Sequence, residues 1–377
     1  MNIKDNMLKN EKNLCEFACK TSEAIRFKEY TEDDIRPAYF RDIDKIIYSL
    51  SYTRYTDKTQ VFSNVDNDNI SRRMTHVQMV SKIARTIGRA LNLNEDLIEA
   101  AALGHDLGHV PFGHTGEAIL SKISQENNEG YFNHNIQSAR LLMNVENNGK
   151  GVNITLQVLD AIMCHNGELV QDKYAPVKKT KEDFLKQYND SYVDKDANKK
   201  MRPMTLEGCV VRISDVVGYI GKDIEDAITL GVIKIEDVPS DILNVLGNTN
   251  SEIINTVVLD IIANSYNKPY ITMSKDVYNA IVNLKAFNYE NIYSKANTSE
   301  ELKTYDMQFR RVFNDYLKDV KNNNKKSRIF TIFLNNMCEE YLNNTTDERK
   351  VIDYIAGMTD DYFVREYNRL IDNKWNI

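Results

Sequence analysis

The sequence predicts an all-α protein, and three observations support this fold class. The 377-residue chain contains only six prolines and fifteen glycines, the residues that most often interrupt helices. Apolar residues recur at helical spacing over long stretches, whereas the alternation typical of strands is scarce. Asn94 precedes one such stretch and is followed by Glu95 and Asp96, as at the start of a helix. We therefore expect a helical bundle with a helical C-terminal extension.

The first clearly periodic helix is expected over 72–91, and a second from Asn94 to about His105. In the first, the apolar stripe consists of Met74, Val77, Val80, Ala84, Ile87 and Leu91. Gly108, Pro111 and Gly113 break the chain directly after the second helix. Further helices are expected at about 115–124, 134–147, 153–165 and 205–229, with several more beyond Ile253. A short hairpin is expected in the Asp57–Asn64 region.

Other stretches read as loops. The segment Lys178–Met204 is charged and poor in large aliphatic residues, which predicts an exposed arm. Lys295–Glu301 is a second polar break, and the Asn-rich patches Asn322–Asn324 and Asn343–Asn344 are expected to be solvated turns. The length favours one large domain or a core with an appendage.

Composition and charge restrict the class of protein. A hydrophobic content of 42% suffices for a sizeable core. A net charge of −7 argues weakly against nucleic acid as the main partner. No apolar run approaches the length of a membrane span, and the first residues lack the apolar core of a signal peptide. Five scattered cysteines do not resemble a disulfide framework, so we expect a cytoplasmic protein with reduced thiols and no membrane partner.

All six histidines fall between His76 and His165, which indicates a single site to which several of them contribute. Histidine titrates near neutral pH and readily binds metals. The alternative is chance clustering of surface or core histidines, but an adjacent His105-Asp106 pair followed by His109 and His114 makes chance a poor explanation. The site is expected at the end of the second helix, where the chain opens into a loop.

A metal centre requires ligands that converge in space and lose their protons at neutral pH. His76 and His105-Asp106 lie on two helices expected to pack antiparallel, and their nitrogen and oxygen donors suit Mn, Fe, Ni, Zn or Mg. Asp215 is the best candidate for a fourth ligand, because a carboxylate in its apolar run is costly to bury without a partner. The alternative for Asp215 is a buried salt bridge, for example to Arg212.

Together, His76, His105-Asp106 and Asp215 resemble the H…HD…D signature of HD-domain metal-dependent phosphohydrolases. More segments resemble the bacterial deoxyguanosine triphosphate triphosphohydrolases, relatives of the vertebrate sterile-alpha-motif HD dNTPase. These segments are Arg41-Asp42, Lys58–Phe62, Arg73–His76, Gly104–His114 with Glu117, Phe132–Ser138, Asp215 with Tyr219, Asp223 and Asp226, and Asp353–Asp360. The resemblance covers about residues 36–370, and the ordered set is far more specific than the HD signature alone.

The resemblance implies hydrolysis of a deoxynucleoside triphosphate at the α-phosphorus, giving deoxynucleoside and inorganic triphosphate. It implies a divalent metal on His76, His105, Asp106 and Asp215. His134 would act as the catalytic proton carrier with Glu117 orienting it, and His109 and His114 would contact the α-phosphate. Arg73 would clamp phosphate, Gln60 and Asp223 would hold the 3′-hydroxyl, and Tyr219 would exclude a 2′-hydroxyl. His165 has either a structural role or a substrate contact, and Asp353–Asp360 has no assigned chemical role.

The resemblance also implies a homo-oligomer, either a hexamer or a tetramer, and it raises an allosteric nucleotide and single-stranded DNA as further partners. We expect an N-terminal segment at 1–35, an HD phosphohydrolase core at 36–230 and a helical C-terminal part at 231–377 packed on the core. Two other functions stay open at this point. One is an HD phosphohydrolase acting on a 5′-nucleotide, a cyclic nucleotide or a signalling nucleotide. The other is a catalytically silent regulator that binds nucleotides or single-stranded nucleic acid.

Overall fold

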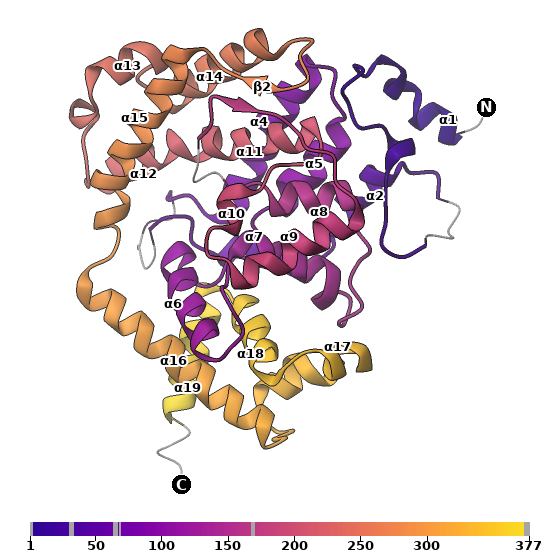
Figure 1. Ribbon diagram of the computed structural model, residues 1–377. Helices are drawn as coiled ribbons and strands as arrows, with labels where there is room; N and C mark the ends of the chain where they lie inside the picture. Colours follow the sequence, from indigo (N-terminus) through magenta and orange to yellow (C-terminus); the bar gives the residue numbers. More distant parts are fainter. Residues whose placement is uncertain (1–2, 30–33, 63–66, 68, 167–169, 373–377) are drawn as a thin grey trace.

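The structure is a computed structural model that describes residues 3–29, 34–62, 67, 69–166 and 170–372. It is built of helices, which confirms the expected all-α class (Figure 1). Within the described ranges, the strands are β1 (Lys173–Tyr174) and β2 (Ile271–Thr272), which pair antiparallel. Two residues per strand are too few to form a sheet that could organise the core.

Five helices form the centre of the molecule: α2 (Ala38–Ile47), α4 (Arg73–Ala90), α5 (Glu95–Gly104), α8 (Leu156–Met163) and α11 (Leu206–Ile220). Helix α5 packs against each of the other four, and α4 and α8 also pack on α11. The apolar stripe expected on α4 turns inward, and α5 and α11 are buried on almost all sides because neighbouring helices surround them. This bundle is the rigid frame of the histidine-rich region.

The predicted N-cap of α5 is confirmed. The Asn94 side chain accepts hydrogen bonds from the backbone N–H groups of Asp96 and Leu97, at 3.2 and 3.3 Å. The cap satisfies two donors that the first helical turn leaves open, and the two acidic residues in that turn favour the positive end of the helix. Helix α5 consequently begins at Glu95, and His105 is the residue that follows its last turn.

The chain after α5 folds back over the bundle through a tight loop. Phe112 and Gly113 have φ angles of 62° and 55°, in the left-handed region, and α6 (Gly113–Glu126) starts there. Next come α7 (His134–Arg140) and a π-helical turn (Leu141–Val145). Gly108 must be glycine, because a Cβ atom there would lie 2.2 Å from the backbone oxygen of His134. The loop and the start of α7 are therefore in direct backbone contact.

Several expectations about elements are wrong. The segment expected as an exposed arm forms α9 (Lys181–Val193) and α10 (Ala197–Lys200), and Phe184 of α9 is fully buried. Its apolar residues are few but fall on one helical face, which packs on α8. The helix expected over 205–229 is broken at Gly221 into α11 and α12 (Lys222–Thr229).

Two smaller corrections concern loops. In the expected hairpin at 57–64, the described residues form a single antiparallel bridge from Thr59 to Arg72, and residues 63 and 64 lie outside the described part. Asn343 and Asn344 end a helix rather than forming a turn, whereas Asn322–Asn324 do form a turn after α16 (Ser299–Lys321).

The remaining helices surround this centre. Helices α16, α18 and α19 gather at one end of the molecule, and α13–α15 lie at the other (Figure 1). The remaining α-helices are α1 (Ile3–Met7), α3 (Leu50–Thr53), α13 (Ser240–Leu246), α14 (Asn250–Ser265), α15 (Lys275–Asn291), α16 (Ser299–Lys321), α17 (Glu339–Asn344), α18 (Asp347–Ala356) and α19 (Asp360–Asp372). Short 3₁₀ turns occur at Lys9–Asn13, Thr21–Glu23, Arg54–Asp57, Ile235–Asp237, Tyr293–Lys295 and Leu334–Asn336, and a π turn occurs at Ile329–Phe333. Among the described residues, no helix combines the length and apolar character that a membrane span requires.

Candidate metal centre

Four predicted ligands converge at the centre of the bundle. His76 comes from the first turn of α4, His105 and Asp106 directly follow α5, and Asp215 comes from α11. The Oδ1 atom of Asp215 lies 3.1 Å from Nε2 of His76 and 3.5 Å from Nε2 of His105. Oδ1 of Asp106 lies 3.4 Å from the same His105 nitrogen. The mutual packing of three helices thus brings residues 139 positions apart into one cluster.

The hydrogen bonding of His105 fits a metal ligand. Its Nδ1 lies 2.7 Å from the Ala102 carbonyl oxygen, which can only accept a hydrogen bond, so Nδ1 carries a proton. In the neutral imidazole, Nε2 then presents a lone pair to the carboxylates of Asp106 and Asp215. This nitrogen is buried and has no hydrogen-bond partner among the described residues. A cation between the imidazole and the carboxylates would satisfy all three groups, and its mixed donors would suit a divalent metal.

The two oxygens of Asp106 face different groups. Oδ2 accepts a hydrogen bond from the guanidinium of Arg73. Oδ1 faces a set of imidazole nitrogens on its other side. Their Nε2 atoms lie at 3.4 Å (His105), 3.4 Å (His109), 3.9 Å (His134) and 3.6 Å (His165). Asp106 is therefore the carboxylate around which the histidine cluster is arranged.

Charges within the cluster keep its acids ionised. Burial alone would raise the pKa of Asp106, but His105, Arg73 and His109 outweigh it and hold that pKa well below its ordinary value. Burial also opposes ionisation of Asp215, yet His105 and His76 lower its pKa. In the metal-free protein, burial lowers the pKa of His105, but Asp106 and Asp215 raise it to about 9. The same attraction that favours a proton on His105 would favour a metal cation.

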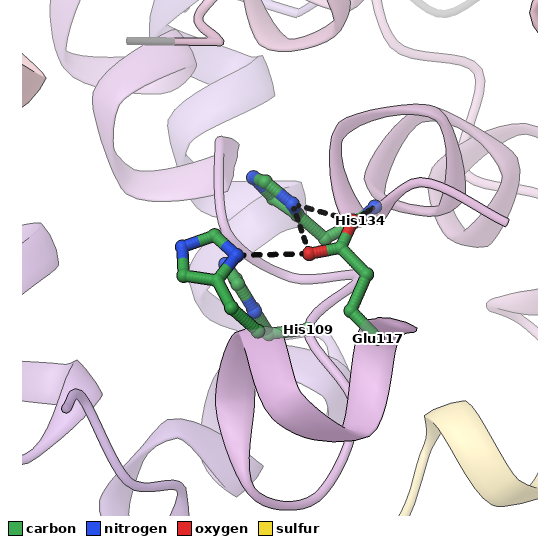
Figure 2. A group of neighbouring side chains, drawn as sticks. His109, Glu117 and His134 are labelled. Carbon is green, nitrogen blue, oxygen red and sulfur yellow. Dashed lines mark hydrogen bonds and ion pairs between the residues drawn. The ribbon is translucent and has the colours of Figure 1, made fainter. Parts of the chain in front are cut away.

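Glu117 and His134 form a hydrogen-bonded pair beside the four ligands (Figure 2). Nδ1 of His134 lies 2.9 and 3.0 Å from the two Glu117 oxygens, and the backbone N–H of His134 donates to the same carboxylate at 2.7 Å. Burial opposes ionisation of Glu117, but its interactions with His134 and His114 outweigh burial and hold the pKa of Glu117 well below its ordinary range. The carboxylate therefore fixes the ring orientation of His134.

His109 and His114 occupy different environments. The His109 ring is buried and stacks on the His134 ring, with 4.0 Å between centroids. Burial and the nearby Arg73 lower the pKa of His109 well below its ordinary value, so it is a neutral imidazole. The side chain of His114 is 65% exposed, and its Nδ1 lies 3.0 Å from Glu117. Of these two, only His114 reaches the solvent.

Arg73 is already engaged by protein groups. Besides the contact with Asp106, its guanidinium donates to the backbone oxygen of Thr59 at 3.0 Å. The side chain is 2% exposed and its Nε has no partner among the described residues. Arg73 consequently supports Asp106, one of the candidate metal ligands.

The residues expected to hold the sugar come from two parts of the chain. Gln60 follows Thr59, and its side-chain oxygen is buried without a hydrogen-bond partner among the described residues. Tyr219 is partly exposed near the end of α11. Asp223 is the second residue of α12 and accepts a hydrogen bond from the hydroxyl of Tyr293 at 2.6 Å. Burial, reinforced by Asp226 and Asp215, raises the pKa of Asp223 to about 7 despite that hydrogen bond.

Three residues acquire a place that sequence reasoning did not give them. His165 lies within the cluster, 3.2 Å from His134 between their Nε2 atoms. Lys58 is buried and donates to the backbone oxygens of His109 and Ala356, the latter at 3.0 Å. Both Asp360 oxygens accept backbone hydrogen bonds, from Thr59 at 3.0 Å and from Phe112 at 3.1 Å. The sequence did offer a signal for each of them. Lys58 and Asp360 lie in segments that carry the family resemblance, and His165 is one of the six clustered histidines.

A separate surface cleft of about 980 Å³ lies between α2, the π turn at 141–145 and the C-terminal helices. None of the six histidines lines it. Its cationic lining residues are Arg36, Arg41, Lys45, Arg54 and Arg365. The cleft is therefore distinct from the histidine cluster, although Asp353 connects its wall to α7 through Arg140.

Comparison with known proteins is consistent with this geometry. The HD domain family matches residues 73–219, and the phosphohydrolase-associated domain family matches residues 271–369. A deoxyguanosinetriphosphate triphosphohydrolase-like protein of Caldanaerobacter subterraneus subsp. tengcongensis is 40% identical over 366 residues, which cover 95% of this chain and 92% of the relative. The chain belongs to the deoxyguanosinetriphosphate triphosphohydrolase-like family.

Further members of this family come from other bacteria. A relative from Clostridium perfringens strain SM101 is 37% identical over 98% of both chains, and one from Clostridium tetani is 36% identical over 92% of this chain and 88% of its own. The region matched as an HD domain contains all four candidate ligands. The phosphohydrolase-associated region contains Asp353 and Asp360, which connect the C-terminal helices to the HD region.

Proposed function

We propose that this family member hydrolyses deoxynucleoside triphosphates, dGTP or several dNTPs, at the α-phosphorus. The products would be deoxynucleoside and inorganic triphosphate. The single observation that carries the proposal is the His76, His105, Asp106 and Asp215 cluster beside the Glu117–His134 pair. The choice of nucleotide is supported by the names of the relatives, which are deoxyguanosinetriphosphate triphosphohydrolase-like proteins.

His76, His105, Asp106 and Asp215 would hold a divalent cation, which would polarise the α-phosphate and activate a water nucleophile. Mn, Mg, Fe, Ni and Zn all remain compatible with the mixed nitrogen and oxygen donors. Arg73 would neutralise Asp106 and, through its unpartnered Nε, approach phosphate. His109 and His114 would contact the α-phosphate, the first as a neutral buried imidazole and the second from the solvent side.

Proton transfer is assigned to His134. Glu117 holds its Nδ1, which leaves Nε2 directed into the cluster, where it can give a proton to the departing 5′-oxygen. The ionised Glu117 stabilises the charged imidazolium before transfer and keeps the ring from rotating. Removal of Glu117 would therefore impair His134 without removing any metal ligand.

Sugar selection is assigned to Gln60, Tyr219 and Asp223. The unpartnered side-chain oxygen of Gln60 can accept a hydrogen bond from a 3′-hydroxyl, as can Asp223. The rigid phenol of Tyr219 would fill the space of a ribose 2′-hydroxyl, so ribonucleotides would meet steric rejection. These assignments predict a preference for dNTPs over NTPs with the same base.

The deciding experiment identifies the products. Purified protein is incubated with each dNTP and NTP, singly and mixed, in Mg²⁺ or Mn²⁺, and the products are separated by anion-exchange chromatography. Inorganic triphosphate and deoxynucleoside are expected, and turnover that occurs only in mixtures would reveal an activating nucleotide. Pyrophosphate or orthophosphate as the first product would contradict the proposal and indicate another HD phosphohydrolase.

His105→Ala and Asp106→Ala provide the matched variants for this assay. Each removes one proposed ligand, and we expect a loss of at least about 10³-fold in kcat/KM, or ~4 kcal/mol of transition-state stabilisation. Binding of an oligonucleotide without turnover in the unmodified protein would instead favour a silent regulator.

The proposal extends to assembly and location. We propose a cytoplasmic homo-oligomer, a hexamer or tetramer, with an allosteric nucleotide and single-stranded DNA as further partners. We also propose that residues 36–230 form the HD core and 231–377 a part packed on it. Light scattering of the purified protein, with and without nucleotides, measures the oligomer number directly.

A further inference from the structure

Lys58 is a buried lysine that has no carboxylate partner among the described residues. Only 2% of the residue is exposed. Its Nζ donates to the backbone oxygen of His109 and, at 3.0 Å, to the backbone oxygen of Ala356. Lysines are rarely buried unless an acid pairs with them, so this amine is held in an unusual way.

The charged groups around Lys58 are engaged with other donors and acceptors. Two acids, Asp106 and Asp360, favour a positive charge on the amine, whereas two cations, Arg54 and Arg73, oppose it. Oδ2 of Asp106 accepts a hydrogen bond from Arg73. Both oxygens of Asp360 accept backbone hydrogen bonds. The amine therefore lies among opposing charges without a direct ionic contact.

The hydrogen bonds of Nζ match a neutral amine. A neutral amine has two N–H groups, and the two carbonyl oxygens accept both of them. An ammonium group has three, and the third finds no acceptor among the described residues. Burial, together with Arg54 and Arg73, lowers the pKa of Lys58 from 10.5 to about 7. Lys58 can therefore gain or lose its proton near neutral pH.

The two carbonyl contacts place Lys58 behind a residue that is proposed to contact phosphate. His109 belongs to the loop after α5, and the charge of a bound triphosphate would arrive beside it. Ala356 is the last residue of α18, where helix carbonyls carry a partial negative charge that is too small to neutralise an ammonium group. In a buried site, an arriving anion would favour the charged form of the amine.

We propose that Lys58 is a positioning residue that holds the His109 loop on the end of α18 and takes up a proton when the triphosphate of the substrate binds. The proton comes from the solvent, and no bond of the nucleotide breaks in this step. The proposal rests on the phosphate contact of the proposed function. It makes the affinity for the nucleotide depend on pH through a residue that is not a metal ligand.

The test compares the unmodified protein with Lys58→Met, whose side chain has a similar length and no charge. KM for dGTP is measured at pH 6 and pH 9, with Mg²⁺ saturating because a bound cation would act on Lys58 in the opposite direction. The ratio of the variant's KM to that of the unmodified protein should fall about tenfold between pH 6 and pH 9. A tenfold change corresponds to a rise of one unit in the pKa of Lys58 on binding.

A second measurement requires no nucleotide. The unfolded chain binds the Lys58 proton more tightly than the folded protein, so folding becomes more favourable as the pH rises from about 7 to 10. The urea midpoint of the unmodified protein should rise over this range relative to that of Lys58→Met. Lys318→Met is the control, because Lys318 is exposed on α16, and it should match the unmodified protein in both measurements.

A KM ratio that is the same at pH 6 and pH 9 would overturn the proposal and leave Lys58 a purely structural role. Equal changes of the urea midpoint in the unmodified protein and in Lys58→Met would also overturn it. Circular dichroism verifies folding, and Lys58→Gln is the second neutral variant if Lys58→Met does not fold.

The two proposals fail separately. The KM ratio can be measured on any nucleotide that the protein hydrolyses, and the dissociation constant of dGTP replaces KM if there is no turnover. Pyrophosphate or orthophosphate as the first product would therefore refute the proposed function alone.

Discussion

Glu207 is a fully buried acid on α11, two helical turns before Asp215. One of its oxygens accepts backbone hydrogen bonds from Cys19 at 2.9 Å and from Asn94 at 3.1 Å. Its other oxygen has no partner among the described residues. Burial outweighs the two hydrogen bonds and raises the pKa of Glu207 from 4.5 to about 7. A carboxyl that supports the N-cap of α5 is thus protonated more readily in the folded protein than in the unfolded chain.

This shift predicts a stability that depends on pH. The folded state binds the Glu207 proton more tightly, so its stabilising effect is complete below pH 4.5 and is lost as the pH rises to about 7. The shift corresponds to about 3 kcal/mol. Glu207→Gln cannot ionise, so it should lose less unfolding free energy than the unmodified protein between pH 4.5 and 8. Urea unfolding at both pH values measures this.

Glu290→Gln is the control, because Glu290 is exposed on α15. It should keep the pH dependence of the unmodified protein. Equal pH dependence in Glu207→Gln and in the unmodified protein would show that folding does not raise the pKa of Glu207.

At the scale of elements, the position of α7 depends on its contact with the loop after α5. The N–H of Gly108 donates to the Ser138 hydroxyl at 2.8 Å, and that hydroxyl lies 2.7 Å from the backbone oxygen of His105. A Cβ atom on Gly108 would also come within 2.4 Å of the Ser138 nitrogen. The contact leaves no room for a side chain, and it fixes His134 relative to the candidate metal ligands.

Gly108→Ala should therefore displace α7. We expect a loss of at least ~2 kcal/mol in unfolding free energy, because backbone atoms must move. We also expect kcat to fall by a larger factor than KM changes, because His134 is displaced with α7. Urea unfolding and steady-state kinetics measure the two effects. Gly231→Ala is the control: a Cβ there meets no atom within 4 Å, and its cost of about 1 kcal/mol comes from its positive φ alone. Comparable activity losses in the two variants would contradict a specific role for the Gly108 contact.

The sequence predicted the elements whose signals are local. Helices α4 and α5, the Asn94 cap and the loop after His105 follow from periodicity, capping and breakers within a few residues. Helix α9 was wrongly predicted to be an exposed arm, because its buried face has few apolar residues and the rest of the segment is highly charged. The His134–His165 contact could not be predicted from the sequence, because it depends on how α7 packs on α8. Family resemblance, more than spacing, identified Glu117 and Gln60 as site residues.

At the scale of the whole molecule, the C-terminal helices bind to the HD region through buried carboxylates. Asp353 of α18 accepts hydrogen bonds from Gln137 at 2.9 Å and from Tyr341 at 2.8 Å, and pairs with Arg140 at 2.7 Å. Asp360, the first residue of α19, holds Thr59 and Phe112. Those two residues belong to the loops that contain Gln60 and His109. The Asp353–Asp360 segment thus positions the site without touching the ligands.

Asp360→Asn should weaken this connection. An amide offers one acceptor oxygen where three donors converge, so at least one buried N–H loses its partner, at about 1–3 kcal/mol of unfolding free energy. We also expect a KM for dNTP that rises several-fold, because the Gln60 loop is released. Asp361→Asn, an exposed acid in the same turn of α19, should change neither quantity. An unchanged KM in Asp360→Asn would show that the loop keeps its position without the carboxylate.

The bonds of Asp360 also bear on how the protein is made. The ligands are complete in the nascent chain once residue 215 has been synthesised, but the residue that holds the two loops is added 145 positions later. Both loops can therefore reach their final positions only after residue 360 has been synthesised. A stop codon between positions 216 and 360 would leave every proposed ligand in place and still remove the anchor of both loops.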